Sequence, residues 1–109
     1  MKPTLDWPNW PCIGEWRCLA SHPALPGHFP GFPIVPGALL LDAGIAQIEA
    51  WSAARVTEVR DARFPGAALP EEPLLLHAQR NGKTVRFALA ASGAEPGPVA
   101  TGTLTLDTV

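Results

Sequence analysis

The chain has 109 residues, a length that favours a single domain over residues 1–109. Hydrophobic residues make up 47% of the sequence and charged residues 17%, which favours a packed core and argues against wholesale disorder. The formal net charge is -2 at pH 7, which argues against a general nucleic-acid binder because such proteins are normally basic.

The termini and the apolar runs bear on location. No apolar run approaches the roughly 20 residues that a membrane span needs. The N-terminal segment MKPTLDWPNWPC has no apolar core like that of a signal peptide. We therefore expect a cytoplasmic protein without a membrane span.

Residues 1–11 contain three prolines and two tryptophans. Proline removes a backbone donor and fixes φ, so we expect an extended arm that the tryptophans pin onto the domain. Residues 12–21 predict a strand with a possible bulge at Gly14. Residues 21–37 hold five prolines and three glycines, a density that excludes regular structure. Apolar side chains around His28 favour a rigid, folded-in loop.

The two cysteines, Cys12 and Cys18, fall in the predicted first strand. At about 3.3 Å per residue they would lie about 20 Å apart, whereas a disulfide needs Cα atoms within about 7 Å. Two thiols are also too few for a metal site. We expect both to be small buried hydrophobic residues in a reducing compartment.

Residues 37–53 predict a helix that starts just after Pro36, where a missing N–H does no harm. Its apolar side chains go nearly all the way round. A helix of this kind is usually buried on every side, so we expect it at the centre of the domain.

The remainder of the chain predicts β structure. Asn81 and Gly82 form the strongest short hairpin signal, and alternation over residues 84–90 predicts one solvent-exposed sheet face. The expected strands and loops are 56–64 (strand), 67–73 (loop), 74–79 and 84–90 (strands), 92–98 (turn) and 99–107 (strand). The predicted fold class is therefore α+β, a curved antiparallel sheet wrapped around one central helix.

Asp42 lies within the apolar helix. An unpaired buried carboxylate is costly or takes up a proton, so Asp42 is either a solvated or arginine-paired residue or an active-site acid. Gln47 either lines the same cavity or hydrogen-bonds to loop carbonyls. His28 is stiffly flanked, and histidine moves protons near neutral pH. Gly37 begins the helix, where its N–H is either an oxyanion donor or an ordinary loop-to-helix amide.

The run from Gly27 to Ala43 reads GHFPGFPIVPGALLLDA. It resembles the signature of the β-hydroxyacyl-(acyl carrier protein) dehydratases of the FabA/FabZ type, which reads G-H-F-P, a short spacer and P-G-[aliphatic]-L-x-x-[D/E]-A. The order of the pieces agrees, as does the fourteen-residue step from His28 to Asp42. The segment Ala62-Arg63-Phe64 before a proline-containing loop is similar to the family's segment after the helix.

This resemblance implies the hotdog fold and carries three roles onto the sequence. His28 corresponds to the catalytic base, Asp42 to the acid and Gly37 to the backbone oxyanion donor. The family works as a dimer or larger assembly, and the histidine and the acid of one site come from different protomers. The resemblance therefore implies a homodimer, or a higher oligomer built from it, with the active site at the dimer interface. The substrate would be a 3-hydroxyacyl chain on the phosphopantetheine of acyl carrier protein, the product a trans-2-enoyl thioester. No cofactor or metal would be needed.

Some features refine or depart from the resemblance. Asp at position 42 is similar to the branch that also isomerises the double bond, but this chain is far shorter, so isomerase activity is not predicted. Its brevity resembles compact dehydratases of specialised pathways such as aryl polyene synthesis. The segment 67–73 departs from the family's usual proline-glycine-acid ending. Arg55, Arg60 and Arg63 either dock the acidic carrier protein or are scattered surface residues.

Two other functions stay open. A hotdog acyl thioesterase hydrolyses the same linkage but usually lacks the G-H-F-P motif with its histidine. A non-catalytic hotdog protein that binds acyl chains would not need His28 or Asp42.

Overall fold

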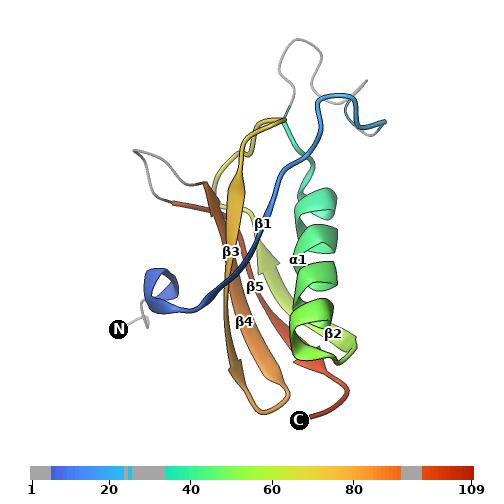
Figure 1. Ribbon diagram of the computed structural model, residues 1–109, viewed down its shortest axis with the longest axis vertical. Coiled ribbons are helices and arrows are strands. Elements are labelled where there is room, and N and C mark those ends of the chain that lie inside the picture. The colour runs from blue at the N-terminus through green and yellow to red at the C-terminus, as the bar shows by residue number, and fades with distance from the viewer. Residues whose placement is uncertain (1–5, 24, 26–33, 92–96) are drawn as a thin grey trace.

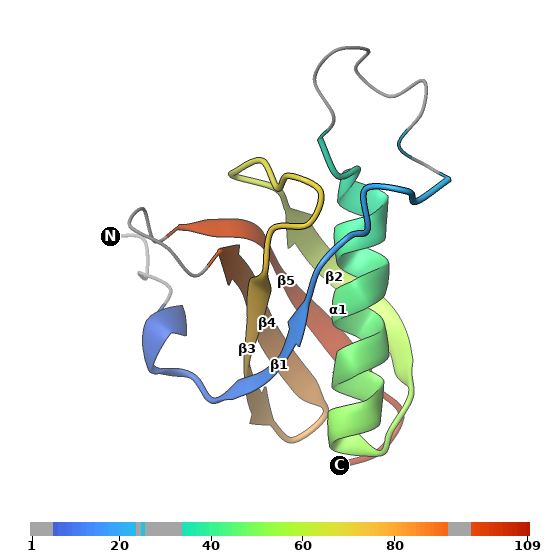
Figure 2. The same cartoon turned by 45° about the horizontal axis from the view of Figure 1, so that its top comes forward.

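The computed structural model describes residues 6–23, 25, 34–91 and 97–109. In chain order its elements are the 3₁₀ helix η1 (Trp7–Asn9), β1 (Cys12–Trp16), α1 (Gly37–Ser52), β2 (Val56–Arg63), β3 (Leu74–Asn81), β4 (Thr84–Ala91) and β5 (Pro98–Leu106). The strands form one antiparallel sheet in the order β1-β3-β4-β5-β2, and α1 packs against one face of it (Figures 1 and 2). The predicted α+β class and the single helix against a curved sheet are confirmed.

The first strand is shorter than predicted. The register of β1 against β3 shifts between Cys12 and Gly14, which confirms the predicted bulge. The strand ends at Trp16, so the prediction that it continues to residue 21 is wrong. Beyond it, the Cys18 carbonyl accepts a hydrogen bond from the Glu71 N–H at 2.7 Å, so the chain pairs with a loop there instead of with the sheet.

The helix is buried on one side only within this chain. Leu40, Gly44 and Ile48 are buried, and their spacing places them on one face toward the sheet. The expectation that α1 is covered on every side is therefore wrong for the single chain, because one sheet covers one face of a helix. The exposed side is formed mostly by alanine, at positions 38, 46 and 50, with Asp42 among them.

Phe87 of β4 lies between the helix and the last strand. A Cβ added at Gly102 of β5 would lie 2.7 Å from the Phe87 ring, and one added at Gly44 of α1 would lie 3.4 Å from it. Phe87 is 1% exposed. The missing side chain at Gly102 thus makes the space in which this ring fits, and the ring lies close to the helix at Gly44.

The alternation over residues 84–90 predicted a solvent-exposed sheet face. The outer face of the sheet is, however, only partly exposed. Ala88 of β4 is completely buried, and Thr101 opposite it is 6% exposed. The N-terminal segment packs against the neighbouring strand β3, where the His77 Nδ1 lies 3.1 Å from the Trp10 carbonyl oxygen and the Trp7 ring contacts the His77 ring edge. The tryptophans do pin the arm to the domain, although it contains a 3₁₀ turn and is not extended throughout.

The two cysteines differ in exposure. Cys18 is buried as expected, whereas Cys12, at the first residue of β1, is exposed, so the expectation of burial is wrong there. Both are free thiols. Burial raises the pKa of the Cys18 thiol, and the nearby Glu71 carboxylate raises it further.

Candidate active site

Gly37 is the first residue of α1, as predicted. Pro36 precedes it in an extended conformation, with φ -60° and ψ 143°, and provides no side-chain cap. The N–H groups of Leu39 and Leu40 both donate to the Pro36 carbonyl, at 3.0 and 3.3 Å. The Gly37 N–H therefore lies at the helix end where the backbone dipoles give a positive partial charge, a suitable place for an anionic oxygen.

Phe64 is a site residue for which sequence reasoning assigned no role. It directly follows β2, and a Cβ added at Gly37 would lie 3.1 Å from its ring. The ring is thus packed over the first residue of the helix while 46% of Phe64 remains exposed. The signal that could have found it is the Ala62-Arg63-Phe64 similarity, which places this ring next to a motif residue.

Asp42 lies on the exposed side of α1, so the expected burial among apolar neighbours is wrong within one chain. A single sheet cannot cover that side of the helix. Among the described residues, none forms a hydrogen bond or ion pair with the Asp42 carboxylate. The carboxylate is therefore open to whatever molecule or segment approaches this side of the helix.

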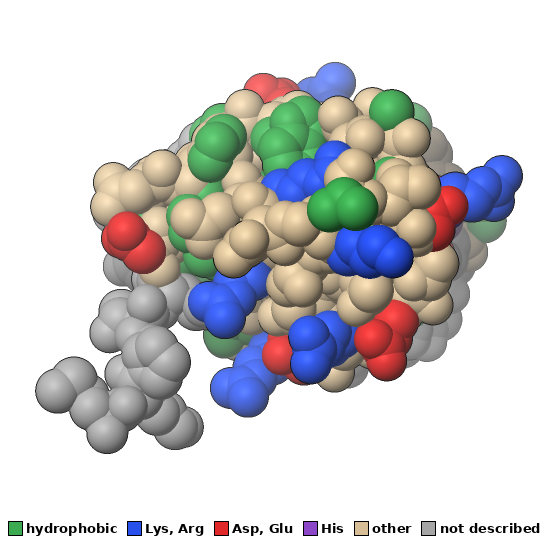
Figure 3. Space-filling model, turned by 90° about the horizontal axis from the view of Figure 1, so that it is seen from below, with side chains coloured by type: hydrophobic (Ala, Val, Ile, Leu, Met, Phe, Trp, Pro, Cys, Tyr) green, Lys and Arg blue, Asp and Glu red, His purple; other side chains and the backbone are tan. Residues whose placement is uncertain are grey.

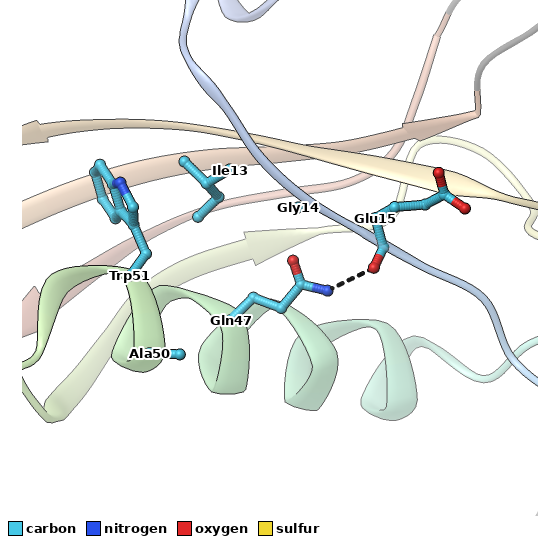
Figure 4. Close-up of a pocket in the computed structure, with 6 residues that line it drawn as sticks. All are labelled: Ile13, Gly14, Glu15, Gln47, Ala50 and Trp51. Carbon is cyan, nitrogen blue, oxygen red and sulfur yellow. Dashed lines mark hydrogen bonds between the residues drawn. The ribbon is translucent and has the colours of Figure 1, made fainter.

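Gln47 points toward β1 and away from the side that carries Asp42. Its Nε2 donates a hydrogen bond to the Glu15 carbonyl at 3.0 Å, while its Oε1 is buried without a hydrogen-bond partner (Figure 4). A Cβ at Gly14 would collide with the Gln47 amide, so a glycine is needed for this approach. The sequence suggested that Gln47 either lines the cavity or hydrogen-bonds to loop carbonyls. The observed bond is of the second kind, although its acceptor is a carbonyl of strand β1.

The same contact borders a surface pocket of about 420 Å³ between β1 and α1. Its lining residues are Ile13, Gly14, Glu15, Gln47, Ala50 and Trp51 (Figure 4).

The structure brings only some of the predicted site residues together. Gly37 and Asp42 lie about 7.5 Å apart along the helix axis, whereas Gln47 lies about 15 Å from Gly37. His28 lies outside the described residues. Within the described ranges, no cluster of three or more His, Cys, Asp or Glu side chains is arranged to hold a metal ion. The helices that the structure describes include none long and apolar enough to cross a membrane.

The arginines considered for carrier-protein docking, Arg55, Arg60 and Arg63, are all exposed. Figure 3 shows one end of the molecule, where Lys and Arg side chains are interspersed with acidic ones. On β2 itself, Glu58 and Asp61 alternate with the basic residues. On this end of the molecule and along β2, acidic side chains thus interrupt the positive charge.

Comparisons with known proteins agree with the motif. Residues 11–103 match the ApeI-like family, described as ApeI dehydratase. The chain is 35% identical over 82 residues to a 3-hydroxyacyl-[acyl-carrier-protein] dehydratase FabZ from Chloroflexus aggregans, covering 66% of this chain and 56% of that protein. It is 31% identical over 77 residues to the FabZ of Pelotomaculum thermopropionicum, covering 62% of this chain and 54% of that protein. The chain thus spans about half the length of these curated relatives.

Two solved structures share the fold. An uncharacterized protein from Erwinia carotovora subsp. atroseptica superposes with a TM-score of 0.71 and 18% identity, over 87% of this chain and 81% of that one. The dehydratase heterocomplex ApeI:P from Xenorhabdus doucetiae gives a TM-score of 0.62 and 18% identity, over 84% and 82% of the two chains. These matches confirm the hotdog fold that the motif implied.

Proposed function

Because this chain belongs to the ApeI-like dehydratase family, we propose that it converts 3-hydroxyacyl-acyl carrier protein into the trans-2-enoyl thioester, in fatty acid or polyene-type biosynthesis. The observation that carries this proposal is the family match over residues 11–103, which contains the complete histidine-to-acid motif. Acyl carrier protein is then the partner, and the cytoplasm is the location predicted from the sequence.

The proposed chemistry is an elimination of water. His28 takes the proton from C2, and the Gly37 N–H at the positive end of α1 stabilises the negative charge that develops on the thioester oxygen. The C3–O bond breaks, and Asp42, protonated or acting through a water, gives the departing hydroxyl the proton it needs to leave as water. The electron pair of the C2–H bond becomes the double bond. No electrons are gained or lost overall, so the reaction calls for no redox cofactor.

A homodimer completes this proposal. The exposed carboxylate of Asp42 supports it, because a general acid needs a more enclosed setting than the open side of a helix. A second copy that covers this side would contribute its own His28 to the site, as the family resemblance implies. Gln47 remains a predicted substrate contact only if the acyl chain reaches the pocket beside β1.

The test is turnover of a 3-hydroxyacyl carrier-protein substrate, followed through the absorbance of the enoyl thioester, or through crotonyl hydration in reverse. His28→Ala should lower turnover by at least about a hundredfold, and Asp42→Asn by a similar order, because each removes an acid–base group. Asp6→Asn is a matched control for Asp42→Asn, since Asp6 is an exposed carboxylate that only binds the Asn9 side chain.

The alternatives predict different results. Release of free thiol without enoyl product would identify a thioesterase. Wild-type turnover by either the His28 or the Asp42 variant would show that the assignment of that residue is wrong. Retained function in both would favour the non-catalytic acyl-binding protein.

A further inference from the structure

Glu71, in the loop between β2 and β3, has a backbone conformation that its residue type disfavours. Its φ is +66°, in the left-handed region where an L side chain is crowded and glycine is preferred. A conformation of this kind persists only when the surrounding contacts hold it in place, and such positions cluster at functional sites. The contacts of Glu71 therefore indicate what this residue does.

The main chain and the side chain of Glu71 both bind the segment that follows β1. The Ala20 N–H donates to the Glu71 carboxylate at 2.7 Å, and the Glu71 N–H donates to the Cys18 carbonyl, also at 2.7 Å. Arg17 lies 3.7 Å from the same carboxylate, but both side chains are about half exposed, so this ion pair contributes little. The two hydrogen bonds thus join segments that are about fifty residues apart in sequence.

The same loop also binds the chain just before the helix. The Val35 N–H donates to the Ala68 carbonyl at 2.9 Å. Val35 is 3% exposed and Ala68 is completely buried, so water does not compete for this bond. Val35 precedes Gly37 by two residues, and the loop lies beside the start of α1 (Figures 1 and 2). This bond therefore fixes the loop against the helix end that carries the candidate oxyanion donor.

Hydrogen bonds inside the loop connect these two contacts. The Leu69 N–H donates to the Glu72 carboxylate at 3.2 Å, and the Glu72 N–H donates to the Leu69 carbonyl at 3.2 Å. Ala68 and Glu71 are three residues apart, so their Cα atoms are separated by at most about 11 Å. Residues 68–72 thus form one short, internally bonded loop that binds the chain on both sides of the dehydratase motif.

On the other side of the motif, the chain leads from Ala20 toward His28 through two turns. The His22 N–H donates to the Leu19 carbonyl at 2.9 Å, and the Leu25 N–H donates to the His22 carbonyl at 3.1 Å. Leu25 is 7% exposed and belongs to the core. His28 itself lies outside the described residues, three positions after Leu25.

We infer that Glu71 is a positioning residue for the candidate active site, since its carboxylate holds segment 18–20 to the loop that also binds Val35. Glu71 does not contact the substrate; it sets the position of the chain before His28 relative to the start of α1 at Gly37. This inference rests on the proposed function, because His28 and Gly37 are the groups that it positions. Displacements of about 1 Å between reacting groups can lower a rate by about a hundredfold.

Two substitutions separate positioning from stability. Glu71→Gly removes the carboxylate but also relieves the backbone strain, so the two effects on stability oppose each other and the Tm should change by less than about 3 °C. Its kcat for the 3-hydroxyacyl carrier-protein substrate should nevertheless fall at least about tenfold, while KM changes by less than about threefold. Glu71→Gln keeps an oxygen that accepts the Ala20 N–H, so it should keep kcat within about twofold of the wild type.

The matched control is Ala53→Gly. Among the described residues, Ala53 is the other non-glycine residue with a positive φ, 56°, and it lies at the C-terminal cap of α1. This substitution relieves the same kind of strain without removing a hydrogen-bonding side chain. It should therefore leave kcat unchanged, and its Tm should not fall.

Amide hydrogen exchange, followed by NMR, tests the contacts without an activity assay. In Glu71→Gly, the Ala20 and Val35 amides should each exchange at least about tenfold faster than in the wild type, whereas in Glu71→Gln both should exchange at close to the wild-type rate. Wild-type kcat in Glu71→Gly, unchanged exchange there at either amide, or a Glu71→Gln variant as slow as Glu71→Gly in turnover would each overturn the inference.

The two measurements keep this result separate from the proposed function. A wild type that forms no enoyl product would contradict the proposed function, while faster exchange at both amides in Glu71→Gly would still support the role of Glu71 in holding the loop. An active wild type whose Glu71→Gly variant keeps its kcat would support the proposed function and contradict the positioning role.

Discussion

The two edge strands of the sheet, β1 and β2, differ in how far the helix covers their unpaired backbone groups. The β1 edge spans Cys12–Trp16, and α1 packs along it, with the Gln47 side chain donating to the Glu15 carbonyl. The β2 edge spans Val56–Arg63, and the helix satisfies only its first N–H, through Glu49. The helix therefore covers one edge of the sheet, whereas the other edge stays open within the described residues. The comparison shows how much of this sheet its single helix can cover.

The largest effect on stability is expected at the covered edge. Gly14→Val places a branched side chain where even a Cβ collides with the Gln47 amide, which must move away and give up its hydrogen bond to the Glu15 carbonyl, so the free energy of unfolding should fall by about 1–2 kcal/mol. Urea denaturation measures it. Gly97→Val is the matched control, because nothing lies within 4 Å of a Cβ added there. Equal losses in the two variants would mean that β1 and α1 are not in close contact.

Removing the Gln47 side-chain amide, the other partner in this contact, should have a smaller effect on stability. Gln47→Ala loses the hydrogen bond to the Glu15 carbonyl, which is worth about 1 kcal/mol of unfolding free energy. In the double variant with Gly14→Val, the collision partner is gone, so the combined loss should be less than the sum of the two single losses. Strict additivity would show that the two residues do not contact each other.

At the open edge, a substitution should barely affect the fold of one chain. Val59→Lys is expected to change the unfolding free energy of the monomer by less than about 0.5 kcal/mol, because the residue is 40% exposed. The measurement is thermal unfolding over a range of protein concentrations. If the proposed homodimer forms through this edge, the wild-type Tm should rise with protein concentration because association stabilises the folded state, and the Tm of the Val59 variant should not. A steady wild-type Tm would remove the contrast between the two edges.

The smallest expected effect is the contribution of Cys18, just beyond β1, to the pH dependence of stability. The pKa of Cys18 is raised from its ordinary value of 9.0 by burial and by Glu71. The unfolded thiol therefore loses its proton first, so stability is fully present below about pH 9 and declines as the pH rises through the folded-state pKa. Urea denaturation at pH 7.5 and pH 10 with a reductant should show this decline, and Cys18→Ala should reduce it. The sequence contains no tyrosine that would titrate in the same range.

Much of the fold could be predicted because its signals are local. The Asn81–Gly82 turn defines the hairpin of β3 and β4, and the boundaries of α1 follow from Pro36 and the apolar run after it. The end of β1 could not be predicted, since it depends on the hydrogen bond between Cys18 and Glu71, which are far apart in sequence. Local patterns carry no information on such partners.

The sequence names candidate site residues, but it does not predict the surroundings of their side chains. The motif locates Gly37 and Asp42 on one helix, yet it does not reveal how much of that helix the sheet covers, and so Asp42 was expected to be buried. Likewise, the packing of Phe64 over Gly37 depends on how the end of β2 approaches the start of α1. Both features depend on tertiary contacts, which a local sequence motif does not reveal.

The packing of Phe87 against Gly44 has a consequence for the acid two residues earlier in the helix. Positions two apart on a helix point in nearly opposite directions, so a ring fitted at Gly44 keeps Asp42 turned outward. Rotation of the helix about its own axis would have to displace a fully enclosed aromatic ring. The direction of the Asp42 side chain is therefore set by packing in the core. A larger side chain at Gly44 would rotate the helix and turn Asp42 in a new direction without contacting it.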